Sequence, residues 1–305
     1  MNSKSAAVII PAYNEEEFIF HTLQALTVNN NLEIIVVDNG STDSTKEIAR
    51  QQGAKVIDFP VGTIAAVRNR GVQDATADVL VFIDADVTVT QQWHEKFSRV
   101  LEQFRQNPLL VTGSRCQPTN SRSLLNKYWY AELTQYDASY INSGHLITSR
   151  ELFNKIHGFS ETLETAEDYD FCQKAVRDGA VISNNPELVV THNGYPQTIA
   201  GFIQRERWHG VQDFESWRSF IQSKIAWFAF LNLGLFVAAI IICFTGSCIA
   251  IPVYFIIMYA ISLLLTIYKF GIKRIDYMLM MPLMFYLYLC GRSLALVDRL
   301  LGIKK

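Results

Sequence analysis

The chain has 305 residues, of which 50% are hydrophobic, and its formal net charge at pH 7 is −2. This length leaves room for one large domain or two small ones, and the nearly balanced charge gives no sign of a nucleic-acid partner. The 5 cysteines are scattered, odd in number and without a Cys-x-x-Cys pair, which argues against a disulfide framework or a zinc site and fits a reducing compartment.

The first expected elements are a strand over residues 6–10, a helix over 18–26 and a strand over 32–37. The N-terminus leads into the first strand without the apolar region of a signal peptide, so we expect the soluble part to stay in the cytosol. Asn14 precedes three glutamates, where it can cap the helix. The second strand ends on Asp38, and a loop of small polar residues follows.

The alternation continues with a helix over 45–52, a strand over 54–59 and a helix within 62–71. The next stretch, 79–87, contains five apolar residues in a row and then two carboxylates, which predicts a strand buried on both faces. Strands that alternate with helices predict an α/β fold with a parallel sheet and right-handed crossovers.

Asp84 and Asp86 stand at the carboxyl end of that strand. In open α/β sheets, ligands bind outside the carboxyl ends of the strands, and residues two apart on an extended chain point the same way. Two carboxylates suit Mg²⁺ or Mn²⁺, which bridges to substrate phosphates. The alternative is a polar turn, where Asp is common. Asp38 should lie on the same edge.

A helix over 92–105 and a strand over 109–115 follow. Residues 124–140 then form a helical pattern rich in aromatic side chains, Tyr136 among them. Such aromatic residues either form core or face an acceptor or the membrane interface. A further strand is expected over 144–148.

The next helical pattern begins near Thr165, which can cap it, and carries Glu167 and Asp168 in its first turn. Acids are electrostatically favourable there whatever the function, yet beside a crevice they are also placed to take a proton. A strand over 188–191 ends in His192, which is either structural or completes a metal site.

Gln204, Arg207 and Trp208 lie in a polar helical stretch. This stretch is either a solvated charged face or a binding surface, since Trp beside Arg can form a stacking platform, and Arg and Gln can contact a diphosphate.

Two apolar stretches, 225–244 and 248–268, are each long enough to cross a membrane and are joined by an uncharged turn. The charged residues lie outside this hairpin, at Arg218, Lys224, Lys269, Lys273 and Arg274. The positive-inside rule therefore places both open ends of the hairpin in the cytosol.

The last apolar run is shorter and is interrupted by Pro282 and Gly291. We expect an interfacial or re-entrant helix over residues 277–296, because Lys304 and Lys305 then remain in the cytosol. The expected domains are a cytosolic domain over 1–220 and a membrane domain over 221–305.

Six short motifs occur in the order seen in family 2 glycosyltransferases, and through them residues 6–210 resemble that family. They are Pro11-Ala12-Tyr13-Asn14-Glu15-Glu16, Asp38-Asn39-Gly40-Ser41-Thr42-Asp43, Ala65-Ala66-Val67-Arg68-Asn69-Arg70-Gly71, Asp84-Ala85-Asp86, Glu167-Asp168 and Gln204-x-x-Arg207-Trp208. The resemblance implies the GT-A fold, a Rossmann-like nucleotide-binding domain that transfers a sugar, with inversion, from a nucleotide-diphosphate donor. We expect a UDP-sugar.

The resemblance also implies roles for single residues. Donor binding would fall to Pro11, Ala12, Tyr13, Glu15, Asp38, Arg68, Asp84, Ala85, Gln204, Arg207 and Trp208. Within this set Arg68 would lie over the nucleotide. Asp84, Asp86 and His192 would hold Mn²⁺ or Mg²⁺. Glu167 and Asp168 would form the catalytic pair, with Asp168 as the base that deprotonates the acceptor hydroxyl.

The Gln-x-x-Arg-Trp motif is typical of processive polysaccharide synthases, but two membrane helices cannot enclose a channel for a polymer. We therefore expect single-sugar transfer to a membrane-associated, lipid-linked acceptor in cell-envelope glycan synthesis. The enzyme would span the inner membrane more than once, with its catalytic domain facing the cytosol.

Three alternatives stay open. A polyprenyl-phosphate glycosyltransferase would share the two-helix tail. Members of that subclass usually have Gly-Lys-Gly where this chain has Val67-Arg68-Asn69. Their acid pair is usually followed by Leu-Gln and prolines, where this chain has Val87-Thr88-Val89-Thr90. A processive synthase could build its channel as a homo-oligomer. A nucleotide-sugar-binding scaffold would need no catalysis.

Overall fold

In a computed structural model, the chain divides into two compact units. The structure describes residues 6–28, 31–119, 122–135 and 140–303. Tyr136, Lys304 and Lys305 lie outside these described residues. The sheet unit is formed by Met1–Thr119 and Thr134–Tyr195, and the helical unit by Asn120–Leu133 and Pro196–Lys305.

This division differs from the expected boundary at residue 220. It arises because Trp129 packs edge-on against the rings of Phe202 and Phe285, with ring centroids 5.7 and 5.2 Å apart. Residues 120–133 and the polar helix near residue 204 therefore join the apolar helices. Tyr128, Trp129 and Tyr130 are buried, so the core interpretation of these aromatic residues is confirmed.

A seven-stranded mixed sheet, in the order β3-β2-β1-β4-β8-β6-β9, forms the centre of the sheet unit. Its strands are β1 Ala6–Ala12, β2 Leu32–Asp38, β3 Lys55–Asp58, β4 Val79–Ile83, β6 Leu110–Gly113, β8 His145–Ser149 and β9 Val181–Asn184. The first four pair in parallel, as expected, whereas β8 runs antiparallel to both β4 and β6. Ala12 lies opposite Asp38, so β1 and β2 end at the same edge.

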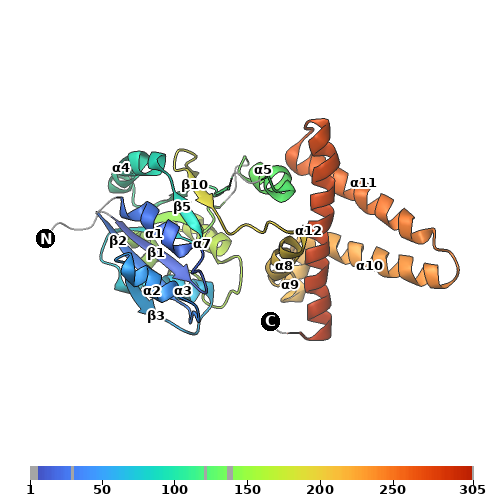
Figure 1. The fold of residues 1–305 in the computed structure, drawn as a ribbon, viewed down its shortest axis with the longest axis horizontal. Helices are drawn as coiled ribbons and strands as arrows, with labels where there is room; N and C mark the ends of the chain where they lie inside the picture. The colour runs from blue at the N-terminus through green and yellow to red at the C-terminus, as the bar shows by residue number, and fades with distance from the viewer. Residues whose placement is uncertain (1–5, 29–30, 120–121, 136–139, 304–305) are drawn as a thin grey trace. The chain divides into compact units, whose positions relative to one another are not determined.

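Helices cover both faces of this sheet (Figure 1). They are α1 Ile19–Thr27, α2 Thr45–Gln51, α3 Ile64–Asp74, α4 Gln91–Gln106, α6 Arg150–Lys155 and α7 Glu167–Arg177. Helices α1 and α4 pack on the face that holds Val81, and Trp93 of α4 stacks on Phe97 there. Helices α3, α6 and α7 pack on the face that holds Phe82. Alternate residues of β4 thus enter opposite cores, which confirms that this strand is buried on both faces.

A second sheet of three short strands, in the order β5-β10-β7, begins with β5 shortly after the carboxyl end of β4. Its strands are β5 Val87–Val89, β7 Gln117–Pro118 and β10 Val190–His192. The strand expected over 79–87 is therefore wrong at its end. It stops at Ile83, and the Val87 N–H donates to the Asp84 carbonyl at 3.0 Å, so the two acids lie on a tight turn.

The helical unit contains three helices that are long and apolar enough to cross a membrane. Its helices are α5 Ala131–Leu133, α8 Ile199–His209, α9 Trp217–Gln222, α10 Lys224–Phe244, α11 Ala250–Phe270 and α12 Ile275–Leu301, with a π-helix at Asn126–Tyr130 and a 3₁₀ turn at Gln212–Phe214. Helices α10 and α11 form a hairpin, and α12 runs across it (Figure 1). The helix expected over 124–140 is present from residue 124 to residue 133, with the π-helix within it, and residues 136–139 lie outside the described residues.

Helix α12 contains the helix expected over residues 277–296 and is continuous through Pro282 and Gly291. The proline removes the N–H that would bond to the Met278 carbonyl, and the Tyr259 hydroxyl of α11 lies 3.5 Å from that oxygen. A Cβ on Gly291 would come within 2.8 Å of the Ile203 carbonyl oxygen. The glycine therefore permits close packing of α12 on α8 and does not break the helix.

A buried polar cluster ties the three long helices together. The Tyr254 hydroxyl of α11 donates to Asn232 of α10 at 2.8 Å, and the Asn232 amide donates to Ser293 of α12 at 2.9 Å. Interhelical hydrogen bonds of this kind hold apolar helices together where the hydrophobic effect cannot. Asn232, the only strongly polar residue of its stretch, thus has a structural role.

Two expected helix caps are wrong. Asn14 is not at a helix terminus: it has a φ of 56°, and its side-chain oxygen accepts the Thr42 N–H at 2.9 Å, which joins two loops at the edge of the sheet. Thr165 does not cap α7 either, because Ala166 intervenes in the left-handed conformation, with a φ of 62°.

Candidate active site

The acidic turn between β4 and β5 is the first component of the site. Besides its own backbone bond, the turn is held by Thr22 of α1, whose hydroxyl donates to the Ala85 carbonyl at 2.7 Å. The methyl group of Ala85 is buried, whereas Asp84 and Asp86 are partly exposed. The turn therefore aims both carboxylates outward from a fixed backbone.

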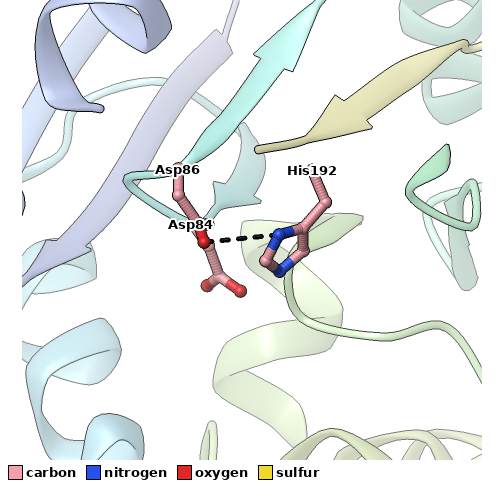
Figure 2. A group of neighbouring side chains, drawn as sticks. All are labelled: Asp84, Asp86 and His192. Atoms are coloured by element: carbon pink, nitrogen blue, oxygen red, sulfur yellow. Dashed lines mark ion pairs between the residues drawn. The ribbon is translucent and has the colours of Figure 1, made fainter. Parts of the chain in front are cut away.

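The small sheet brings His192 to these acids. Strand β10 pairs antiparallel with β5, with His192 opposite Val87. Its Nδ1 atom lies 3.3 Å from Oδ2 of Asp86 (Figure 2). The candidate ligand atoms of Asp84, Asp86 and His192 all lie within 4.8 Å of one another. The three residues expected to bind a metal are thus together.

This donor set fits a divalent cation. Two carboxylate oxygens and one imidazole nitrogen suit Mn²⁺ well and leave positions open for substrate oxygens. The ring of Tyr195 stacks on that of His192, with centroids 4.0 Å apart and planes 9° apart. A Cβ on Gly194 would lie only 2.0 Å from Oδ2 of Asp86, so glycine is needed for the carboxylate to keep its place.

A buried arginine connects this turn to a second acidic pair. Arg68 of α3 is 2% exposed. Its Nη2 atom lies 2.7 Å from Oδ1 of Asp84, and its Nη1 atom 2.7 Å from Oε1 of Glu167. A guanidinium can be buried only when carboxylates satisfy it in good geometry. The same contacts fix the first turn of α7 relative to β4.

Glu167 and Asp168 are both buried and oriented by named donors. The Ser143 hydroxyl donates to Oε1 of Glu167 at 3.1 Å. The two oxygens of Asp168 accept backbone N–H groups from Ser143 at 3.3 Å and Tyr169 at 2.7 Å. Burial and, second, the charge of Glu167 raise the pKa of Asp168 to about 7. A carboxylate with such a pKa is suited to proton transfer near neutral pH.

The ends of β1 and β2 form the other side of the edge. Pro11 and Ala12 are buried at the end of β1, while Tyr13 is 59% exposed. Burial and then the charge of Asp84 raise the pKa of Glu15 to about 7.

Asp38 is 1% exposed, and its Oδ2 atom accepts the N–H groups of Gly40 and Ser41, each at 3.0 Å. Its buried Oδ1 atom has no hydrogen-bond partner among the described residues. A buried acceptor of this kind can take a hydrogen bond from a water molecule or a ligand.

Gln204, Arg207 and Trp208 lie on α8, which belongs to the helical unit, whereas the acidic site belongs to the sheet unit. Gln204 and Trp208 are both exposed and one helical turn apart, so they share a free face. Arg207 instead forms a bidentate ion pair with Asp298 of α12.

Sequence reasoning missed several residues that shape the site, namely Ser143, Gly144, Ala166, Gly194 and Tyr195. Only the two glycines could have been noticed in the sequence. Gly144 directly precedes the strand that begins at His145, and Gly194 comes two residues after the strand that ends at His192. A Cβ on Gly144 would lie 2.9 Å from Oδ2 of Asp84. Ser143 acts through a contact with α7 that only the folded chain reveals.

Comparisons with known proteins agree with this geometry. The family model for Glycosyl transferase family 2 matches residues 7–163. Glycosyltransferase AglE of Haloferax volcanii is 42% identical over 101 residues, which cover 30% of this chain and 33% of AglE. The pre-mycofactocin glycosyltransferase of Mycobacterium tuberculosis is 25% identical over 225 residues, which cover 68% of this chain and 46% of that protein.

These curated relatives are therefore matched over less than half of their length. A solved structure extends the likeness in fold. Mannosyltransferase PcManGT from Pyrobaculum calidifontis, in complex with GDP-Man and Mn²⁺, superimposes with a TM-score of 0.63 at 20% identity, over 100% of this chain and 89% of that one. The fold is GT-A, as the resemblance implied.

The buried position of Arg68 makes its loss costly. We expect Arg68→Met to lower the free energy of unfolding by about 3–5 kcal/mol, because the buried Glu167 and the partly buried Asp84 lose their cation. Arg70→Met is the matched control on the same helix, since Arg70 pairs with Asp74 at the surface, where such a pair contributes about 0.5 kcal/mol. Thermal unfolding of both variants measures the difference. Equal midpoints would contradict the structural role of Arg68.

The close approach of Gly194 gives a second prediction. In Gly194→Ala the new Cβ displaces the Asp86 carboxylate, so Mn²⁺ affinity should fall about 10- to 100-fold, as when a residue that orients a ligand is changed. Isothermal titration with Mn²⁺ measures this. Gly234→Ala is the control, because a Cβ there meets nothing within 4 Å. Unchanged Mn²⁺ binding in Gly194→Ala would argue against a metal at Asp86.

Proposed function

The chain belongs to glycosyl transferase family 2, and from this we propose that it is a metal-dependent, inverting glycosyltransferase that moves a sugar from a nucleotide-diphosphate donor to a membrane-associated acceptor. One observation carries the proposal. The cluster of Asp84, Asp86 and His192 is joined through Arg68 to the buried pair Glu167 and Asp168. The site that could bind the metal and the diphosphate, and the carboxylate that could accept a proton, are thus held in fixed positions relative to one another.

Asp84, Asp86 and His192 would hold Mn²⁺ or Mg²⁺. The bound ion would neutralise the charge that builds on the departing diphosphate. The mannosyltransferase PcManGT, which shares the fold, is in complex with GDP-Man and Mn²⁺, which supports this assignment. The partial exposure of both aspartates leaves them accessible to a donor.

Asp168 would act as the base. Its two backbone donors hold the carboxylate in one orientation, and the raised pKa makes it a better proton acceptor than an ordinary aspartate. It would take the proton of the acceptor hydroxyl as that oxygen attacks the anomeric carbon from the side opposite the diphosphate. Attack from that side inverts the configuration at this carbon.

Arg68 and Glu167 would act by positioning. Resemblance alone placed Arg68 over the nucleotide and Glu167 in the catalytic pair. However, both are buried and each is already engaged, Glu167 by the guanidinium and by Ser143. We therefore propose that Arg68 and Glu167 hold Asp84 and Asp168 in position.

The donor base would bind at Asp38. The free Oδ1 atom is an acceptor for a ring N–H, a group that both uracil and guanine present. A UDP-sugar, our expectation from the sequence, fits this acceptor, and so does a GDP-sugar. Tyr13 is exposed beside the same edge and would cover the base by stacking.

A lipid-linked acceptor is supported by an apolar groove in the helical unit, of about 440 Å³. Its walls come from α9, α10, α12 and the segment before α9, with Phe214, Glu215, Ser216, Trp217, Phe220, Trp227, Phe230, Leu296, Arg299 and Leu300. Aromatic residues beside an apolar helix are typical of the membrane interface, and an arginine at the rim suits a phosphate.

The same unit supports placement in the inner membrane, with the catalytic domain in the cytosol. Helices α10 and α11 would cross as a hairpin, because charged residues flank its open end and the turn has none. Helix α12 runs across this hairpin and is buried more than either crossing (Figure 1). We therefore propose that it lies at the interface.

Removing the base tests the proposal directly. We expect Asp168→Asn to lower the turnover of detergent-solubilised protein roughly 10²- to 10⁴-fold, while donor affinity stays unchanged. The assay measures nucleoside diphosphate released from a panel of nucleotide sugars with Mn²⁺ and a membrane lipid extract. Asp170→Asn, on the same helix and in an ion pair with Lys174 at 3.1 Å, is the control. Full turnover in Asp168→Asn would contradict the assignment, and a wild type that binds donors without turnover would point to a scaffold.

The raised pKa of Asp168 predicts a pH profile. Only the deprotonated carboxylate accepts a proton, so kcat/KM should rise with pH through about 7 and level off above about pH 8. Rates are measured at saturating Mn²⁺, so that loss of metal from the other acids does not distort the curve. The Asp170→Asn control should give the same profile. A flat profile between about pH 6 and 8 would show that Asp168 does not titrate in this range.

A further inference from the structure

Two of the five cysteines meet at the tip of the hairpin formed by α10 and α11. Cys243 lies in the last turn of α10, and Cys248 lies two residues before α11 begins. Their Sγ atoms are 2.6 Å apart. In the sequence these cysteines are five residues apart, and only the turn between them brings their side chains together.

The turn between them is shaped to make this approach. Gly246 has a φ of 102°, a conformation that glycine adopts without strain. Its N–H donates to the Cys243 carbonyl at 3.1 Å, and the Ser247 N–H donates to the Ile242 carbonyl at 3.3 Å. These bonds fold the chain back after the last turn of α10, so the second cysteine returns to the first.

The separation of the sulfur atoms favours a covalent bond. A disulfide has an S–S distance of about 2.05 Å, so the two atoms need to close by only about 0.5 Å. Both side chains are also accessible: Cys248 is exposed and Cys243 is half-buried. The other three cysteines differ, since Cys116 and Cys172 are buried in the sheet unit and Cys290 lies within α12.

The proposed membrane placement puts this tip in an oxidising compartment. If the charged ends of α10 and α11 face the cytosol, the uncharged tip emerges on the opposite side. Disulfides form and persist outside the cytosol but not within it. The inference therefore rests on the proposed orientation of the hairpin.

We propose that Cys243 and Cys248 form a disulfide at the extracytoplasmic tip of the hairpin. The two thiols lose two protons and two electrons, and a sulfur–sulfur bond forms between them. The electrons pass by thiol–disulfide exchange to a protein disulfide on that side of the membrane, whose own S–S bond breaks to give two thiols. The new bond links the last turn of α10 to the start of α11 and prevents the two helix ends from separating.

Thiol counting on the full-length protein in its membranes tests the proposal. Cells are quenched in acid to stop thiol exchange, and the protein is unfolded in detergent with excess N-ethylmaleimide, which blocks every free thiol. After reduction, a polyethylene-glycol maleimide labels only cysteines that had been oxidised. We expect the wild type to gain two labels after reduction and none without it.

Single variants assign the bond. Cys243→Ser and Cys248→Ser should each gain no label, whereas the matched control Cys290→Ser should keep both. A wild type that gains no label has two free thiols at the tip, and this overturns the proposal. Labels that persist in Cys248→Ser come from another pair and overturn it as well.

The outcome is separable from the proposed catalysis. Sugar transfer is assayed on the same membranes, and the Cys243→Ser and Cys248→Ser variants should retain wild-type turnover, because neither residue lies in the sheet unit. Free thiols together with full turnover would reject the disulfide and leave the catalytic proposal intact. Loss of turnover on serine substitution would contradict a purely structural bond.

Discussion

The buried guanidinium of Arg68 is the constraint on which the geometry of the site depends. A charge so far from water is tolerated only between partners that nearly cancel it, and here the partners are Asp84 and Glu167. One belongs to the turn after β4 and the other to the first turn of α7, 83 residues further along the chain by the numbering. The arginine thus fixes the turn after β4 and the first turn of α7 relative to one another.

This site contains several features that would be unfavourable in an ordinary fold. Asp168 is buried although its charged form is costly there, Ala166 adopts a left-handed backbone, and Gly194 lies against a carboxylate where no side chain would fit. Departures from local preference concentrate at functional sites, where surrounding packing compensates for them. The two apolar cores on either side of the sheet supply that compensation.

Much of the fold could be predicted from local pattern. The apolar strands, their alternation with helices and the acids at their carboxyl ends follow from periodicity and chain order, and β4 is buried on both faces as expected. The direction of β8 could not be predicted, because antiparallel pairing leaves no mark on a short apolar strand. The helix expected over 277–296 is present as part of α12. The approach of the Tyr259 hydroxyl to the Met278 carbonyl could not be predicted, because it comes from another helix. All three residues of the metal cluster were predicted, and so was the strand that ends in His192. Its pairing with β5, which brings His192 to Asp86, could not be predicted, because β5 and β7 are too short to be recognised.

The close packing of α8 on α12 has a consequence for where the chain works. Besides the contact at Gly291, two ion pairs join these helices, Arg207 with Asp298 and Arg292 with Glu206. Gln204 and Trp208 therefore keep a constant distance from α12. On the proposed placement of α12 at the membrane surface, the exposed face of α8 would stand at a fixed height above the lipid headgroups. It would select acceptors by how far their reactive hydroxyl stands above the bilayer.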